Sequence, residues 1–109
     1  IKGTVNKGAV VAANGARLPL PPKDARAKEG QQVVYGIRPE DLTLGKGFDI
    51  ALSVTEPTGP ELHVYGDLGD EEICAVLRER ADLKRGEKVA LAPRLDRVHL
   101  FDADSGKAL

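Results

Sequence analysis

The sequence predicts an all-β protein, a small barrel or sandwich of about eight or nine short strands. Apolar and polar residues alternate with a period of two along most of the chain, as in strands that bury one face. Turn-forming glycine and proline residues separate these segments at short intervals. Long stretches with the 3.6-residue period of helices are missing.

The predicted N-terminal elements are a hairpin and a connection. The dipeptide Asn14-Gly15 separates the apolar segments 9–12 and 17–20. Both of its residues accept positive φ angles, so it predicts a tight β-hairpin. Residues 21–30 are mostly polar and begin with two prolines, which favours a surface connection over a helix.

A strand and a turn are predicted next. Val33, Tyr35 and Ile37 alternate toward one side, as in a strand. Residues 38–41, Arg-Pro-Glu-Asp, end this strand. Pro39 favours one helical turn there, because its fixed φ suits the first position of a helix.

Three consecutive strands in the middle of the chain predict a meander. The first spans 48–55 and stops at 57–60, Pro-Thr-Gly-Pro, because proline removes a ladder donor and glycine admits unusual backbone angles. A second glycine-rich turn is expected at 66–70. The predicted inward residues are Phe48, Ile50, Leu52 and Val54, then Leu62, Val64 and Leu68, then Ile73, Ala75 and Leu77.

The last two predicted strands follow a turn at 84–87, Lys-Arg-Gly-Glu. Val89 and Leu91 mark the inward face of the first strand, and Val98 and Leu100 mark that of the second. We expect all these elements to form one domain, residues 1–109, because a chain of 109 residues leaves too little material for two.

Composition argues against several classes of function. Sixteen Lys and Arg against 17 Asp and Glu give a net charge of −1, without the basic excess of nucleic-acid-binding proteins. The aromatic residues are Tyr35, Phe48, Tyr65 and Phe101, and alternation turns two of them inward, which leaves few positions for stacking bases. The longest apolar run, 9–13, is too short to span a bilayer. We therefore expect no nucleic-acid partner, and membrane association only through other proteins.

Candidate catalytic and metal-ligating residues are few. His63 and His99 are expected on strands, opposite the apolar face, and two histidines fall short of the three or four ligands that a metal usually needs. The single cysteine, Cys74, lies between Ile73 and Ala75, which favours a packed thiol over a nucleophile. No glycine-rich phosphate loop is present. The sequence therefore predicts no catalytic residue, no metal site and no cofactor site in this chain.

Several segments carry motifs of one family. Residues 35–41 are similar to its G-[IV]-R-P-E-[DH] segment, residues 54–61 to its V-x-E-x-x-G-x-E turn, and residues 99–106 to its H-L-F-D-x-x-[ST]-G ending. Residues 3–5 and 85–89 also fit, in the same order. The whole chain thus resembles the C-terminal regulatory domain of the ATP-binding subunits of carbohydrate ABC importers, of the maltose, multiple-sugar and glycerol-3-phosphate type.

The resemblance implies a small OB-type β-barrel, often called a TOBE domain, that follows an ATPase domain absent from this chain. It implies a non-catalytic regulatory and dimerisation domain in the cytoplasm, at the inner face of the membrane. The implied partners are a second copy of the subunit, the membrane-spanning subunits through the ATPase domain, and a regulatory protein or small effector. ATP and Mg²⁺ are expected only in the ATPase domain, so this chain alone is not expected to be an enzyme.

Within this resemblance, six residues are expected to mediate interactions: Arg38, Glu40, Glu56, Glu61, His99 and Phe101. Arg38 suits a bidentate contact with a carboxylate across the barrel or across a dimer, although 36–41 could simply end a strand. Glu56 and Glu61 flank a turn, where they are read by a partner or only aid solubility. His99 and Phe101 share the face opposite Leu100, which forms an interface or is covered by the N-terminal hairpin.

An alternative from another functional class is a module that senses a small oxyanion or sugar. Related TOBE modules in oxyanion transport bind small anions between paired domains. Backbone amides at glycine turns, together with Arg38, would supply such an anion site.

Overall fold

The computed structural model describes residues 1–20, 27–79 and 82–109, so most of the predicted connection at 21–30 lies outside the described residues. The described residues form nine strands in two antiparallel sheets, with two short 3-10 turns. This confirms the all-β prediction and its number of strands. No helix in the described parts of the chain is long and apolar enough to cross a membrane.

The first sheet has the strand order β3-β2-β1-β4-β9. Its strands are β1 (Lys2–Asn6), β2 (Ala9–Ala12), β3 (Arg17–Pro19), β4 (Gln32–Gly36) and β9 (His99–Asp102). The hairpin predicted at Asn14-Gly15 joins β2 to β3 and is confirmed, with Gly15 at a φ of 87°. A hairpin at Lys7-Gly8, which joins β1 to β2, was not predicted.

The second sheet has the order β7-β6-β5-β8. β5 (Leu42–Thr58), β6 (Glu61–Leu68) and β7 (Glu71–Leu77) are the predicted meander, and β8 (Lys88–Pro93) pairs with the other side of β5. The observed turns are shorter than the predicted ones: Gly59-Pro60 and Gly69-Asp70 alone reverse the chain. β5 runs through Pro57, which is tolerated because β8 pairs only with residues 42–51 and leaves this end of β5 with a free edge.

A β-bulge at Ser53 overturns the prediction for Val54. Leu52 is the Cα partner of Gly66, but Val54 is the Cα partner of Tyr65, so β5 contains one extra residue between them. Leu52 is buried as predicted, whereas Val54 is turned outward and is 50% exposed.

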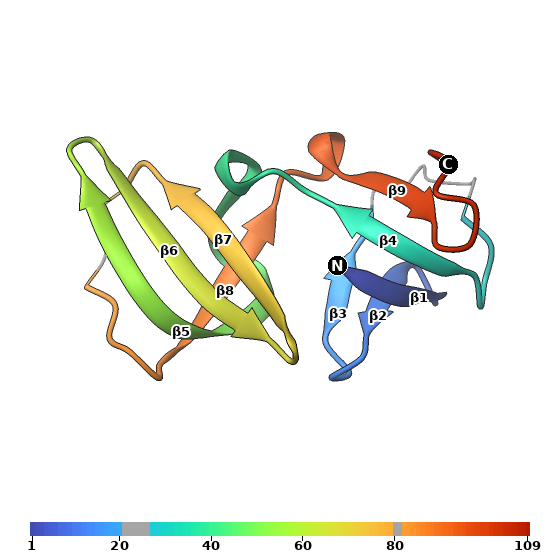
Figure 1. The fold of residues 1–109 in the computed structure, drawn as a ribbon, viewed down its shortest axis with the longest axis horizontal. Coiled ribbons are helices and arrows are strands. Elements are labelled where there is room, and N and C mark those ends of the chain that lie inside the picture. Colours follow the sequence, from blue (N-terminus) through green and yellow to red (C-terminus); the bar gives the residue numbers. More distant parts are fainter. Residues whose placement is uncertain (21–26, 80–81) are drawn as a thin grey trace.

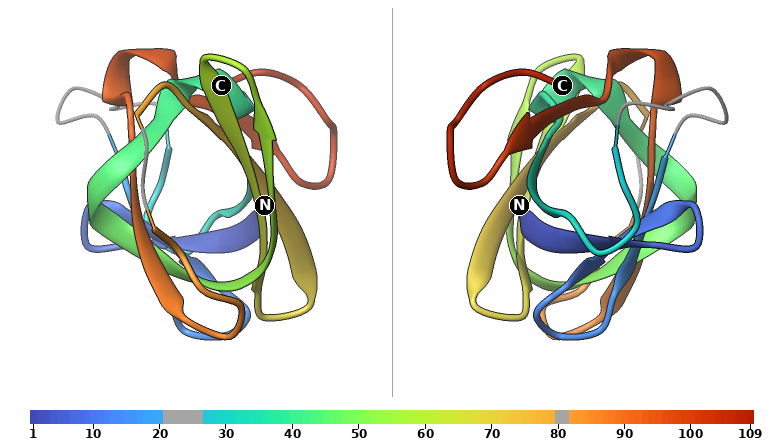
Figure 2. Two further views of the ribbon diagram at one scale, coloured as in Figure 1. Left: turned by 90° about the vertical axis from the view of Figure 1, so that its left-hand side faces the viewer. Right: turned by 90° about the vertical axis from the view of Figure 1, so that its right-hand side faces the viewer.

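The two sheets follow one another along the long axis of the molecule, with the second sheet on the left of Figure 1. Seen along that axis, the strands wrap into an open barrel (Figure 2). One buried apolar cluster runs through both sheets and includes Val10, Val33 and Tyr35 from the first and Ile50, Val64 and Leu91 from the second.

Candidate interaction surface

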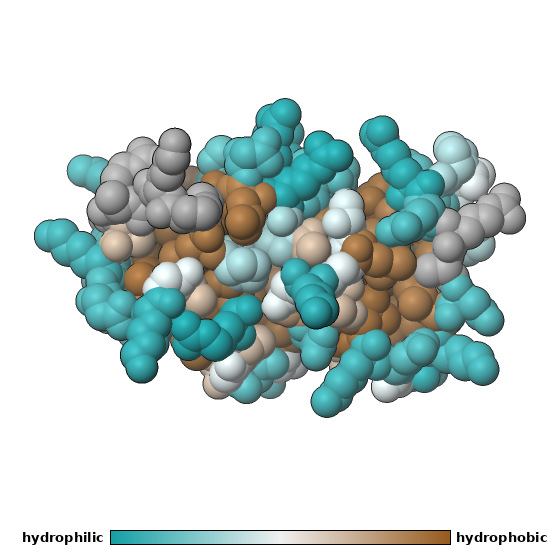
Figure 3. All heavy atoms as spheres, turned by 180° about the vertical axis from the view of Figure 1, so that it is seen from behind, coloured by the Kyte–Doolittle hydropathy of each residue, from teal (hydrophilic) through white to brown (hydrophobic). Residues whose placement is uncertain are grey.

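One edge of the molecule gathers the crossovers between the sheets and the tip of the longest hairpin. The turns η1 (Pro39–Asp41) and η2 (Leu95–Arg97), the tip of the β5–β6 hairpin and the start of β9 lie along the top of Figures 1 and 2. We call this the upper edge. The β2–β3 and β6–β7 turns lie at the opposite, lower edge (Figure 1). From behind, hydrophilic side chains gather along both edges, and apolar side chains show between them (Figure 3).

A backbone hydrogen bond joins the two crossovers. Pro39 begins η1 as predicted, and the Asp41 N–H donates to the Arg38 carbonyl at 2.9 Å. The Arg94 N–H, at the start of η2, donates to the Asp41 carbonyl at 2.9 Å. The connections β4–η1–β5 and β8–η2–β9 are therefore fixed side by side at the upper edge.

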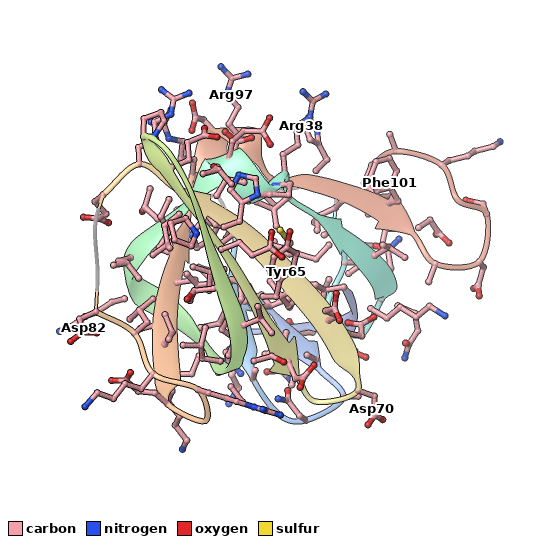
Figure 4. The ribbon with its side chains drawn as sticks, turned by 60° about the vertical axis from the view of Figure 1, so that its left-hand side comes forward. Arg38, Tyr65, Asp70, Asp82, Arg97 and Phe101 are labelled. Carbon is pink, nitrogen blue, oxygen red and sulfur yellow. The ribbon has the colours of Figure 1, made fainter. Side chains whose placement is uncertain are left out.

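Three arginines on these crossovers are exposed: Arg38, Arg94 and Arg97. Arg38 and Arg97 project away from the ribbon (Figure 4). Within the described ranges, no carboxylate lies within 4.0 Å of these guanidinium groups, so Arg38 has no ion-pair partner across the barrel. Sequence reasoning missed Arg94 and Arg97, although both flank a turn between two predicted strands just as Arg38 does.

A groove of about 400 Å³ separates η1 from the end of β7. Its lining carries two arginines and three carboxylates and consists of Glu40, Asp41, Leu42, Thr43, Val76, Leu77, Arg78, Glu79 and Arg94. Because cations and anions are mixed, the groove favours neither sign of ligand strongly.

The β5–β6 hairpin brings Glu56 and Glu61 close to His63. The Glu61 Oε1 lies 3.5 Å from the His63 Nε2, and Glu56 is the Cα partner of His63 on the neighbouring strand. His99 lies on the other sheet, so the two histidines do not converge. The parts of the chain that the structure describes contain no group of three metal-ligating side chains.

Phe101 is half-buried, which corrects the expectation of an exposed aromatic residue. Its ring packs on Gly36: a Cβ atom at Gly36 would lie 3.1 Å from the Phe101 Cε2. The Phe101 backbone also pairs with Val34 on one side and forms a bridge to Ala108 on the other. Strand β4 and the C-terminal segment therefore cover Phe101, rather than the N-terminal hairpin.

The loop after β9 explains why a family motif ends in Asp-x-x-Ser-Gly. The Asp102 Oδ1 accepts N–H groups from Asp104 at 2.8 Å and Ser105 at 3.1 Å. Hydrogen bonds from Ser105 and then Asp104 hold the pKa of Asp102 below its usual value. Gly106 has a φ of 74° and donates its N–H to the Asp102 carbonyl at 2.8 Å. This motif closes a loop.

Cys74 is not packed in the core, contrary to the prediction. It lies half-exposed on the outer side of β7, because its neighbours Ile73 and Ala75 take the inward positions. Its Cα partner is Tyr65 on β6. Partial burial raises the pKa of the Cys74 thiol, which disfavours a nucleophilic thiolate.

The antiparallel barrel with a charged edge is the architecture of a small OB-type domain. A family model described as "MalK OB fold domain" matches residues 1–42, and one described as "TOBE domain" matches residues 35–101. The chain therefore belongs to the TOBE domain family.

Several longer proteins contain a segment that is similar to this chain. An ABC transporter ATP-binding protein of Sinorhizobium fredii is 43% identical over 105 residues, which cover 89% of this chain and 28% of that protein. A sulfoquinovosyl glycerol transport ATP-binding protein of Agrobacterium fabrum is 29% identical, covering 99% of this chain and 32% of that protein. An sn-glycerol-3-phosphate import ATP-binding protein of Cereibacter sphaeroides is 28% identical, covering 94% and 29%. The chain thus spans about a third of the length of its curated relatives.

Proposed function

We propose that this chain is the regulatory and dimerisation domain of the ATP-binding subunit of an ABC importer for sugars or glycerol-3-phosphate. Membership of the TOBE family and the names of the relatives support this class of transporter. The subunit would act in the cytoplasm, held at the inner face of the membrane by the membrane-spanning subunits. ATP and Mg²⁺ would bind outside this domain, which needs no cofactor of its own and receives signals from a regulatory protein or small effector.

The exposed arginines of the upper edge carry the pairing part of the proposal. Arg38, Arg94 and Arg97 have no carboxylate partner among the described residues, whereas Glu40 and Glu56 lie exposed nearby on the same edge. A two-fold axis through this edge would place the arginines of one copy beside the carboxylates of the other. Such reciprocal charge contacts fix the orientation of two subunits more than they add affinity. Glu61 and His99 would also contact the second copy, and the half-buried Phe101 would pack beneath these residues.

Charge reversal in the full-length subunit tests this pairing. Arg38→Glu with Arg94→Glu should weaken dimerisation by about tenfold, because like charges then oppose each other across the interface. Analytical ultracentrifugation measures the effect. Lys88→Glu with Lys107→Glu is the matched control, since it makes the same change in charge away from the upper edge.

Adding Glu40→Lys and Glu56→Lys to the arginine reversals should restore pairing. If the arginine variant and the control dimerise equally well, the upper edge is not the interface. The isolated 109-residue chain should hydrolyse no ATP, and turnover by the purified chain would disprove the non-catalytic role.

The alternative of a small-ligand sensor receives less support. The groove beside η1 contains Arg78 and Arg94, but Glu40, Asp41 and Glu79 oppose an anion there. Calorimetry with phosphate, molybdate, glycerol-3-phosphate and sugars distinguishes the two functions, because a saturable heat would favour the sensor.

A further inference from the structure

Charge is distributed very unevenly along the chain. The meander, residues 48–77, carries seven Asp and Glu residues and no Lys or Arg. The rest of the chain carries all 16 Lys and Arg with the other ten Asp and Glu. A near-neutral protein therefore contains one strongly acidic segment, while the other parts of the second sheet carry Lys46 and Lys88.

The outer side of this sheet is arranged in rows across the strands β5, β6 and β7. Val54, Tyr65 and Cys74 form a central row, because each is the Cα partner of the next. Ala51, Asp67 and Glu72 form the row on one side, which the exposed Lys88 of β8 extends as the Cα partner of Ala51. Glu56, His63 and Val76 form the row on the other side. We call these three rows the acidic face. Figure 4 shows its centre at Tyr65, on the side of β6 away from the barrel interior.

The centre of the acidic face is apolar and accessible. Val54 is 50% exposed, and it is the single exposed large hydrophobic residue of the described ranges. Tyr65 and Cys74 beside it are half-exposed. The Ser53 bulge turns Val54 into this row, because regular alternation would have buried it.

Within the described residues, no Lys or Arg side chain lies within 4.0 Å of the carboxylates of the acidic face. Asp67 and Glu72 are directly opposite each other on neighbouring strands, a like-charge pair that destabilises a sheet. The pKa of the Tyr65 hydroxyl is raised by Cys74, by burial, and then by the carboxylates of Glu56 and Glu72. The negative electrostatic potential of the carboxylates in both outer rows therefore reaches the apolar centre.

We propose that the acidic face is a docking surface for a basic segment of another protein, in which an apolar side chain lies between two Lys or Arg residues. Charge complementarity selects this occupant, because nucleic acid or the same face of a second copy would be repelled. The rows are separated by two residues along β6 and β7, about 6.6 Å, whereas the bulge makes Val54 the third residue after Ala51 on β5. An extended segment presents alternate side chains at the same spacing, so the sequence cation-x-apolar-x-cation fits all three rows.

The acidic face shares Glu56 with the proposed pairing contact and contains none of the arginines of the upper edge. The inference is tested with the nitrogen-15-labelled 109-residue chain and the blocked peptide Lys-Ser-Leu-Ser-Lys. Two-dimensional NMR should show saturable shifts centred on the amides of Val54, Tyr65 and Cys74 at millimolar peptide. The scrambled peptide Lys-Lys-Leu-Ser-Ser and the apolar-deficient Lys-Ser-Ser-Ser-Lys should each bind at least about fivefold more weakly.

Variants of the protein locate the contact. Glu56→Lys with Glu72→Lys should weaken binding by at least about tenfold, since two attractive contacts become repulsive. Asp82→Lys with Asp104→Lys is the matched control. These substitutions make the same change in net charge at two exposed residues that lie outside the acidic face. Val54→Thr keeps a β-branched side chain on an exposed strand position and should weaken binding without unfolding the sheet.

Four results would overturn the proposal. The first is no saturable shift up to about 10 mM peptide, a weaker affinity than a specific contact needs. The second is equal binding by the scrambled peptide, which would indicate nonspecific charge attraction. The third is an equal effect of the two charge-reversal variants. The fourth is a concentration-dependent shift of the same amides without peptide, which would identify a second copy as the occupant.

Discussion

Tyr35 is the largest fully buried side chain, and its hydroxyl ties together two strands that do not pair. It lies on β4 and donates to the Pro19 carbonyl on β3 at 2.7 Å. Burial raises the pKa of Tyr35 far above its usual value, so the hydroxyl keeps its proton at any ordinary pH. A buried polar group satisfied in this way specifies how the first sheet curves over the core.

Tyr35→Phe should lower the free energy of unfolding by about 1–2 kcal/mol, because the Pro19 carbonyl loses its donor. Urea unfolding followed by circular dichroism measures the change. Tyr65→Phe removes the hydroxyl of the half-exposed tyrosine and should cost less than about 0.5 kcal/mol. Equal losses in the two variants would show that the Tyr35 hydrogen bond contributes nothing special.

At the scale of single residues, the sequence predicts whether a side chain points inward where the alternation of apolar and polar residues alone determines it. Alternation correctly predicts the inward positions of Val33 and Leu100. It also predicts the outward position of Cys74, but the apolar neighbours of Cys74 favoured a packed thiol instead. The partner of Tyr35 could not be predicted, because no local pattern connects it to a carbonyl 16 residues earlier in the chain.

At the scale of elements, β5 departs most from its predicted form. Alternation in the sequence continues through Ser53, so the bulge that reverses the exposure of Val54 leaves no mark in the pattern. The neighbouring strand approaches β5 closely at this point. Gly66 faces β5 at the bulge, where a Cβ atom would lie 2.7 Å from the Ala51 carbonyl oxygen and from the Ile50 Cδ1.

Gly66→Ala should lower the free energy of unfolding by about 1–3 kcal/mol, because the added methyl group forces β5 and β6 apart. Thermal or urea unfolding gives the value. Ala90→Ser, on the exposed side of β8, is a matched small change in the same sheet and should stay within about 0.5 kcal/mol. A neutral Gly66→Ala variant would mean that the strands can separate at the bulge without loss.

At the scale of the whole molecule, the residues of the upper edge can be predicted only in part from the sequence. The family motifs point to Arg38, Glu40, Glu56 and Glu61, and whether these residues mediate pairing stays a prediction. Arg94 and Arg97 join them because one backbone hydrogen bond fixes the second crossover beside the first. Such a contact between distant segments has no signature in either of them.

One buried cluster through both sheets predicts that the chain unfolds as one unit, and the single domain expected from the sequence stays a prediction. The sheets are also linked directly, because β3 contacts β5. In a Tyr65→Phe variant, Tyr35 is the remaining tyrosine and the chain has no tryptophan, so tyrosine fluorescence reports on the first sheet. The amide signal of Val64, which is fully buried on β6, reports on the second in two-dimensional NMR. The two probes should give the same urea midpoint, since loss of either sheet exposes the apolar face of the other. Separate midpoints would instead identify two folding units and would locate the boundary at the crossovers of the upper edge.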